Sequence, residues 1–221
     1  TVTDANNCEI IDSITIIEPQ PLGSTTAVTS DYNGQDISCF GANDGQAQVG
    51  IMGGTTPYAY NWSNGDLTDT ANNLTAGQYF VTITDANGCE IIDNITVTEP
   101  QDLGSTIAVI SDFNGQDISC NGGSDGQAQV AVTGGTTLYS YLWSDGQTAD
   151  IAINLAAGEH FVTVTDANGC QIIDSITLTE PQPLGSTTAV TSDYNGQDIS
   201  CFGANDGQAA VTCIGGIQPY A

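Results

Sequence analysis

Residues 127–146 read QAQVAVTGGTTLYSYLWSDG, two alternating segments of apolar and polar residues that a Gly-Gly pair separates. Alternation with a period of two is typical of a β-strand with one buried face. Short apolar segments continue at 151–155, 161–165 and 172–179, with turn-forming residues between them. No stretch has a sustained helical period, so the pattern predicts an antiparallel β-sandwich.

The pattern recurs along the chain with an 81-residue step. Thr84–Cys89 reads TDANGC, and closely related segments stand at Thr3–Cys8 and Thr165–Cys170. Self-similarity at one period is the sequence signature of a tandem array. Each copy ends in a Glu-Pro pair, whose proline stiffens the chain and indicates a domain junction. We therefore predict an all-β chain of tandem Ig-like antiparallel β-sandwich repeats with an 81-residue period.

The repeat divides the chain into four predicted segments. Residues 1–19 are expected to be the C-terminal strands of a truncated repeat, and 20–100 and 101–181 two complete Ig-like repeats. Residues 182–221 are expected to be the N-terminal part of a further truncated repeat, so the chain is interpreted as a window on a longer array. The pair Asn33–Gly34, which recurs in each repeat, predicts a tight hairpin turn.

The chain has 221 residues, with no Lys or Arg and with 26 Asp and Glu, which gives a formal net charge of −26. Binding to nucleic acid or to an anionic membrane surface needs cationic side chains, so the composition excludes both. No apolar run could span a bilayer, so no direct membrane insertion is expected, and the first residues show no signal peptide. The carboxylates repel one another, and a saline or calcium-bearing medium is therefore expected.

Seven cysteines are present, and the first six form two columns with the 81-residue step. Zinc is not expected, because there is no close Cys-x-x-Cys pair and only one His. Disulfides fit better and imply an oxidising, extracellular setting. One possible connectivity joins Cys89 to Cys120 across the Glu-Pro linker.

The other connectivity joins Cys39 to Cys89 and Cys120 to Cys170, each inside one repeat. We favour it because roughly four strand traverses separate Cys120 from Cys170, and an even number returns the chain to its starting end. Cys8 and Cys201 would then pair with cysteines outside the fragment. Cys213 occupies a strand position that Val132 and Ile51 hold in the other repeats, so it is expected to be a small buried apolar residue.

Carboxylates and amides at the repeat junctions are the candidate metal ligands, because Ca²⁺ prefers oxygen ligands. In a tandem sandwich the loop before the last strand faces the exit of the preceding repeat, so Ca²⁺ is predicted to stiffen the junctions. The alternative is that Asp-Ala-Asn-Gly simply forms a turn. The predicted ligands are Glu18, Asp85 and Asn87 at one junction and Glu99, Asp166 and Asn168 at the next.

No catalytic residue is predicted. His160, the only histidine, takes the place of Tyr79 in the neighbouring repeat, and a catalytic base would not be exchanged for tyrosine. There is no glycine-rich phosphate loop and no Lys for a Schiff base. Trp62 and Trp143 are one 81-residue step apart and are expected to fill the cores. The sequence therefore predicts that the chain is not an enzyme.

Several motifs, in order, resemble the SprB-type repeat of large Bacteroidota gliding-motility and cell-surface adhesins. The resemblance covers essentially the whole chain. It implies an extracellular, cell-surface protein that is exported by type IX secretion. The motifs are CxGxxDG at Cys39–Gly45, GGTTPY at Gly53–Tyr58, WSNG at Trp62–Gly65, AGxY at Ala76–Tyr79 and VTITDANGC at Val81–Cys89.

The resemblance also makes O-glycosylation relevant, since Bacteroidota modify an Asp-Ser/Thr-apolar pattern. The chain matches this pattern at Ser13, Thr70 and Ser175, which are predicted O-linked sites. The alternative is that so short a pattern occurs by chance.

The first functional hypothesis is a structural stalk or filament segment of a very long secreted adhesin, with a role in gliding motility. Its expected partners are neighbouring repeats of the same chain, other copies in a filament, and an external surface or glycan at a distal tip. The second hypothesis is that the repeats themselves bind carbohydrate or a mineral surface. The third is that they are spacers in a secreted enzyme.

Overall fold

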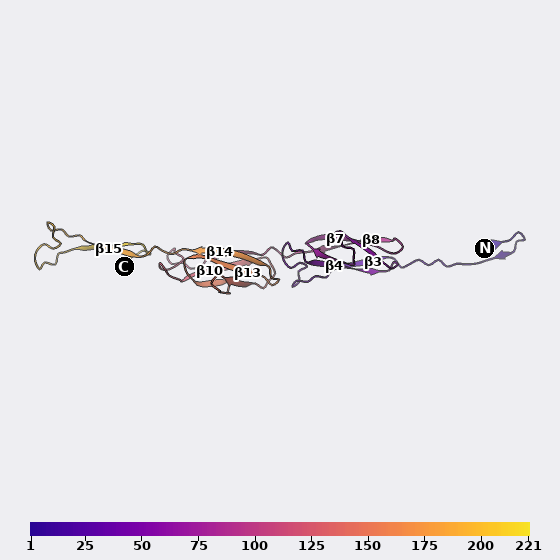
Figure 1. The fold of residues 1–221 in the computed structure, drawn as a ribbon, viewed down its shortest axis with the longest axis horizontal. Helices are drawn as coiled ribbons and strands as arrows, with labels where there is room; N and C mark the ends of the chain where they lie inside the picture. The colour runs from indigo at the N-terminus through magenta and orange to yellow at the C-terminus, as the bar shows by residue number, and fades with distance from the viewer. The chain divides into compact units, whose positions relative to one another are not determined.

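The computed structural model describes all 221 residues, which form strands and loops without any helix (Figure 1). No segment forms a helix that is long and apolar enough to cross a membrane. The chain divides into two compact units, Thr1–Glu99 and Pro100–Ala221, which are described separately.

The first unit contains a complete sandwich of two three-stranded antiparallel sheets, with strand orders β3-β4-β6 and β5-β7-β8. In one sheet the second strand pairs with the first and the fourth, and in the other the fifth pairs with the third and the sixth, which is the arrangement of an Ig-like sandwich. In Figure 1 the labels β3 and β4 mark one layer and β7 and β8 the other. The strands are β3 Gly23–Val28, β4 Gly45–Met52, β5 Ala59–Trp62, β6 Thr70–Leu74, β7 Gly77–Thr84 and β8 Glu90–Val97.

The second unit contains a sandwich of the same topology, with strand orders β12-β10-β9 and β11-β13-β14. Each of its strands begins one 81-residue step after its counterpart in the first unit. The predicted period and the all-β, Ig-like fold class are therefore confirmed. The strands are β9 Gly104–Val109, β10 Gly126–Thr133, β11 Ser140–Trp143, β12 Ile151–Leu155, β13 Gly158–Thr165 and β14 Gln171–Leu178.

Each sandwich has one core, built from the inward-facing residues of alternating strands. In β4 and β10 every second residue is buried over the first five positions, as the sequence alternation predicts. Trp62 and Trp143 are each 2% exposed, which confirms their predicted place in the cores. Their indole N–H groups donate to the carbonyl oxygens of Thr68 at 3.0 Å and Ala149 at 2.9 Å, so the polar edge of each ring is satisfied.

Two hairpins lie outside the complete sandwiches. Near the N-terminus, β1 (Val2–Thr3) pairs with β2 (Glu9–Ile10). In the second unit, β15 (Gly185–Val190) pairs with β16 (Ala209–Ile214) but has no second sheet against it. Val211 is accordingly 63% exposed, whereas its counterpart in the first repeat, Val49, is 3% exposed.

The predicted tight turn is present at Asn33–Gly34. Both residues have positive φ, 53° and 85°, which is the requirement of a type I′ turn. The backbones of Tyr32 and Gln35 exchange hydrogen bonds of 2.8 and 3.1 Å across it. Asparagine and glycine tolerate this conformation at little cost, so the pair determines the turn locally.

Candidate functional site at the ends of each repeat

The entry end of a repeat is the end at which the chain arrives and β3 begins. Gly53 and Gly54 follow β4 there with φ of +66° and +63°, and the Gly54 N–H donates to the carbonyl oxygen of Gln20 at 2.9 Å. A Cβ on Gly53 would overlap the carbonyl group of Pro21. The two glycines therefore let the entering chain lie directly against the end of β4.

Asp85 holds the loop at this end through backbone hydrogen bonds. Its side chain is 5% exposed. One oxygen accepts the N–H of Thr55 at 2.9 Å, and the other accepts those of Asn87 and Cys89, each at 2.9 Å. These donors, Cys89 foremost, hold the pKa of Asp85 below its ordinary value. In the second repeat Asp166 accepts the corresponding N–H groups.

The exit end of a repeat carries a second pair of carboxylates, of which Glu99 was predicted as a metal ligand and Asp36 was missed by sequence reasoning. The Gly41 N–H donates to the Glu99 carboxylate at 2.7 Å, although the two residues are 58 positions apart. Asp36 accepts the backbone N–H and the hydroxyl of Thr98 at 2.8 and 2.6 Å. The signal that could have found these groups is their recurrence one repeat later, where Gly122 donates to Glu180 and Thr179 donates to Asp117.

A third carboxylate closes the loop before the second strand of each repeat. Burial alone would raise the pKa of Asp44, but hydrogen bonds from Ser38 outweigh it, so this pKa lies below its ordinary value. Asp125 is held in the same way, chiefly by the Ser119 hydroxyl and then by its backbone N–H, and its pKa is also lowered. Carboxylates without cationic partners are thus stabilised by neutral donors.

We expect these hydrogen bonds to make the chain acid-labile. A carboxyl whose folded pKa lies below the unfolded value of about 3.9 stabilises the fold above that value, and the gain is lost as the pH falls through the folded pKa. In 0.15 M salt, which screens repulsion between exposed carboxylates, the melting temperature should fall steeply below about pH 4. Thermal unfolding followed by circular dichroism between pH 7 and 2 measures this.

The matched variants are Asp85→Asn and Glu159→Gln, since Glu159 is exposed on β13. Asp85→Asn should lower the melting temperature at pH 7 and flatten its fall in acid, whereas Glu159→Gln should leave the curve in place. A melting temperature that rises continuously down to pH 3 would show that charge repulsion outweighs the hydrogen bonds.

The predicted calcium ligands are only partly brought together. Glu18 and Asp85 line one pocket at the entry end, but both Asp85 oxygens already accept backbone N–H groups. The Asn87 amide donates to the Thr55 hydroxyl at 2.9 Å, and the Asn168 amide makes the same contact with Thr136 at 3.1 Å. The structure shows no group of three or more His, Cys, Asp or Glu placed to hold a metal ion. Calcium at the junctions stays a prediction, which an unchanged melting temperature on Ca²⁺ titration would contradict.

The cysteines differ from the favoured pairing. Cys39 and Cys170 are disulfide-bonded. The others, including Cys89 and Cys120, are free thiols. Neither of the two predicted pairs inside a repeat is therefore formed, and neither is the alternative bond between Cys89 and Cys120. Cys8, Cys201 and Cys213 are also free in this chain.

The favoured pairing was wrong because each strand was taken to cross the repeat from one end to the other, whereas two of the short strands together cross it once. β10 and β13 both end at the entry end, where the N–H of Thr136 bonds to Asp166. β12 is antiparallel to β10, and β11 is antiparallel to β13, so β11 and β12 run in the same direction. They have only four and five residues and together make one traverse. Three traverses, an odd number, therefore place Cys120 and Cys170 at opposite ends of the repeat.

His160 has a structural contact that matches that of Tyr79. Its Nε2 lies 2.9 Å from the carbonyl oxygen of Ala156, four residues earlier. The Tyr79 hydroxyl donates to the carbonyl of Thr75, also four residues earlier, at 3.1 Å. The two side chains therefore make equivalent contacts with the turn that precedes their strand.

The predicted glycosylation residues occupy different surroundings. Ser13 and Ser175 are exposed, whereas Thr70 is half-buried on β6 and its hydroxyl donates to the Asp69 carboxylate at 3.2 Å. O-glycosylation at all three stays a prediction.

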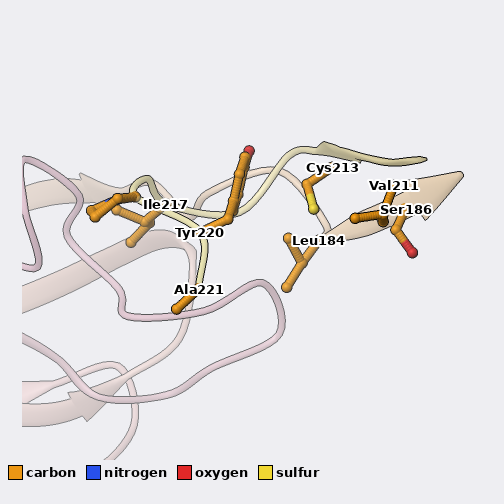
Figure 2. A pocket seen from close by; sticks show the side chains of 9 residues that line it. Leu184, Ser186, Val211, Cys213, Ile217, Tyr220 and Ala221 are labelled. Carbon is orange, nitrogen blue, oxygen red and sulfur yellow. The ribbon is translucent and has the colours of Figure 1, made fainter. Parts of the chain in front are cut away.

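A pocket on the β15–β16 hairpin has a simple structural origin. Figure 2 shows its lining side chains, with the Cys213 sulfur directed toward Leu184. Val211 lines it as well, on the face that is covered by the second sheet in both complete repeats. The pocket is thus the uncovered half of a core and not a preformed ligand site, and Cys213 lies there half-buried at an apolar core position.

A known protein family matches the chain at three places, which begin one 81-residue step apart. The model of the SprB repeat matches residues 32–67, 113–148 and 194–221. These three stretches of the chain are similar to the SprB repeat. Each match begins at the Asn-Gly hairpin, and the first two extend past Trp62 and Trp143, so the three matches fall in the same part of each 81-residue unit. No curated protein sequence matches the chain.

Two solved structures are similar to this chain. One is an amphioxus IgVJ-C2 molecule, 12% identical, with a TM-score of 0.28, in a match that covers 57% of this chain and 89% of that one. The other is the C-terminal 282-residue fragment of intimin, in complex with the intimin-binding domain of the translocated intimin receptor. It is 12% identical, with a TM-score of 0.33, and the match covers 81% of this chain and 67% of that one.

Proposed function

We propose that the chain is a structural segment of a long, secreted cell-surface adhesin, in which tandem SprB repeats form a stalk or filament. The observation that carries the proposal is that successive repeats present the same two ends. Asp85 and Asp166 organise the entry ends, and Glu99 and Glu180 the exit ends, each with the same backbone partners. Identical ends allow one module to be added after another without a new interface.

Two further features support a mechanical role rather than a catalytic one. No buried side-chain nitrogen or oxygen lacks a hydrogen-bond partner, so neither core keeps an unused polar group for chemistry. A chain of −26 net charge without cations also repels copies of itself, which favours an extended and soluble segment. A role in gliding motility and export by type IX secretion belong to the same proposal.

In-register deletion tests the proposal in cells that produce the full protein. Removing residues 101–181 joins two Glu-Pro-type junctions without a change of register, so we expect a folded, surface-exposed protein, a shorter filament by electron microscopy, and retained adhesion. Removal of residues 101–160 breaks the register and serves as the misfolding control. Immunogold labelling before and after surface proteolysis reports exposure.

Three results would contradict the stalk. Labelling only inside lysed cells would remove the surface location. A complete loss of adhesion with the protein still folded and exposed would favour repeats that bind the target themselves. Normal filament length after the deletion would show that the repeats are not part of the filament.

A further inference from the structure

The first and last strands of each complete repeat run in the same direction. In the first repeat, β4 and β7 both end at the entry end, where the Thr55 N–H bonds to Asp85. β3 is antiparallel to β4, and β8 is antiparallel to β7, so β3 and β8 both run from the entry end to the exit end. The two strands belong to different sheets but lie against each other, as do β9 and β14 in the second repeat.

Side-chain hydrogen bonds join these two strands in the first repeat. The Ser24 hydroxyl on β3 donates to the Asp93 carboxylate on β8 at 2.9 Å. The Thr26 hydroxyl donates to the carbonyl oxygen of Asn94 at 2.8 Å. The contacts advance along both strands in the same order, as parallel strands require. β3 and β8 are therefore connected directly, in addition to their pairing within their own sheets.

The second repeat keeps one of these two bonds. The Ser105 hydroxyl donates to the Asp174 carboxylate at 3.1 Å. Ile107 stands one 81-residue step after Thr26 and packs against the core instead. An apolar, β-branched side chain is thus accommodated at this position, but it has no hydroxyl to donate.

The chain is also held just outside both strands. Directly before β3, the carbonyl oxygen of Gln20 accepts the Gly54 N–H at 2.9 Å. Directly after β8, the backbone N–H and the hydroxyl of Thr98 donate to the Asp36 carboxylate at 2.8 and 2.6 Å. These bonds must break before β3 or β8 can be peeled away from its end.

Tension along the backbone loads these strands in shear. It enters a repeat at the start of β3, at the entry end, and leaves at the end of β8, at the exit end. Each strand is thus pulled along its own axis, in opposite directions. Antiparallel ladder bonds lie perpendicular to the strands, so all the bonds of a strand resist this movement together. A strand that is pulled sideways loses its bonds one after another.

We propose that each complete repeat is a mechanical clamp, in which the parallel first and last strands resist tension by shear. The inference deepens the proposed stalk and rests on it for the direction of the load, since a stalk is pulled through its two ends. Each repeat has its own core, so an overloaded array unfolds one repeat at a time and lengthens without breaking.

Single-molecule force spectroscopy of the full chain, held by its two termini, measures the clamp. Dithiothreitol is present so that tension passes through the backbone alone, because Cys39 and Cys170 are disulfide-bonded. We expect one unfolding event for each complete repeat. Each event should lengthen the chain by about 24 nm, which is residues 23–97 at about 3.6 Å per residue less the length of the folded repeat.

The direction of pulling provides the matched control. Cys89 is an exposed free thiol in the entry-end loop, so a variant with alanine at every other cysteine position can be held there and at the N-terminus. Both handles then act at the entry end, and β3 is peeled away one contact at a time. We expect the first repeat to unfold at a several-fold lower force than in the same variant held by its termini. Equal forces in the two directions would overturn the clamp.

Two substitutions on β3 test the bonds between the strands. Thr26→Val removes the hydroxyl and keeps the shape of the side chain, so one of the two unfolding events should move to a lower force. Thr25→Val changes an exposed neighbour on the same strand and should leave both events in place. If the two variants unfold at the same forces, the contact between β3 and β8 bears no load and the proposal is overturned.

Failure of the clamp and failure of the stalk give different results. Equal forces in the two pulling directions overturn the clamp in the purified chain and leave the deletion test in cells unaffected. Labelling only inside lysed cells overturns the stalk, whereas a direction-dependent unfolding force still shows that the repeat resists shear.

Discussion

Replacement of Trp62 by alanine is expected to unfold the repeat at residues 20–100 while the repeat at 101–181 stays folded. Trp62 is 2% exposed at the centre of its core, and its indole N–H holds the Thr68 carbonyl. Loss of a buried tryptophan costs about 3–5 kcal/mol, which is comparable to the whole stability of a small domain. The effect should stay local because each repeat has its own core.

The chain provides its own reporter for this prediction. After Trp62→Ala the only remaining tryptophan is Trp143, so fluorescence follows the second repeat alone while circular dichroism follows both. We expect a fluorescence transition close to that of the parent chain and an earlier, separate dichroism transition. Trp143→Ala is the reciprocal control. Simultaneous unfolding of both repeats in either variant would contradict independent cores.

Gly134→Ala adds one methyl group and is expected to lower the free energy of unfolding of its repeat strongly. Gly134 has φ +67°, and an added Cβ would overlap the carbonyl group of Asp102 in the entering chain. Left-handed backbone costs alanine about 1–2 kcal/mol, and the overlap adds about 1–3 kcal/mol. We therefore expect a loss of about 2–5 kcal/mol in the free energy of unfolding.

Gly146→Ala is the matched control, because Gly146 has φ +91° but open space around its added Cβ. It should lose only the conformational part, about 1–2 kcal/mol. Urea unfolding measures both variants. Hydrogen exchange of the Gly135 N–H, which bonds to the Gln101 carbonyl at 2.8 Å, should accelerate in Gly134→Ala alone. Equal losses in the two variants would show that close approach at the entry end does not matter.

The repeat and its strands could be predicted because their signals are local. The alternation in β4 and β10, the Asn-Gly turns and the tryptophan positions each depend on residues that are neighbours in sequence. Each of these signals recurs after 81 residues, so the prediction of a strand or turn does not depend on one segment alone.

The site at the repeat ends was harder to predict because its partners are distant in sequence. Glu99 was expected to bind a metal, and its observed contact with the Gly41 N–H spans 58 residues. Asp85 is also a predicted metal ligand, and both of its oxygens accept backbone N–H groups that the sequence did not reveal. A sequence shows that a carboxylate recurs, but it does not show which donor the fold brings to it.

The sequence by itself determined that this protein is a series of like β-sandwiches, because strand periodicity, turns and the repeat step are properties of neighbouring residues. Only the tertiary structure decided which end of a sandwich each cysteine occupies. That decision depends on β11 and β12 running in the same direction in different sheets, which their pairing with β13 and β10 determines. Strand direction is a property of the packed pair of sheets, and no single stretch of residues encodes it.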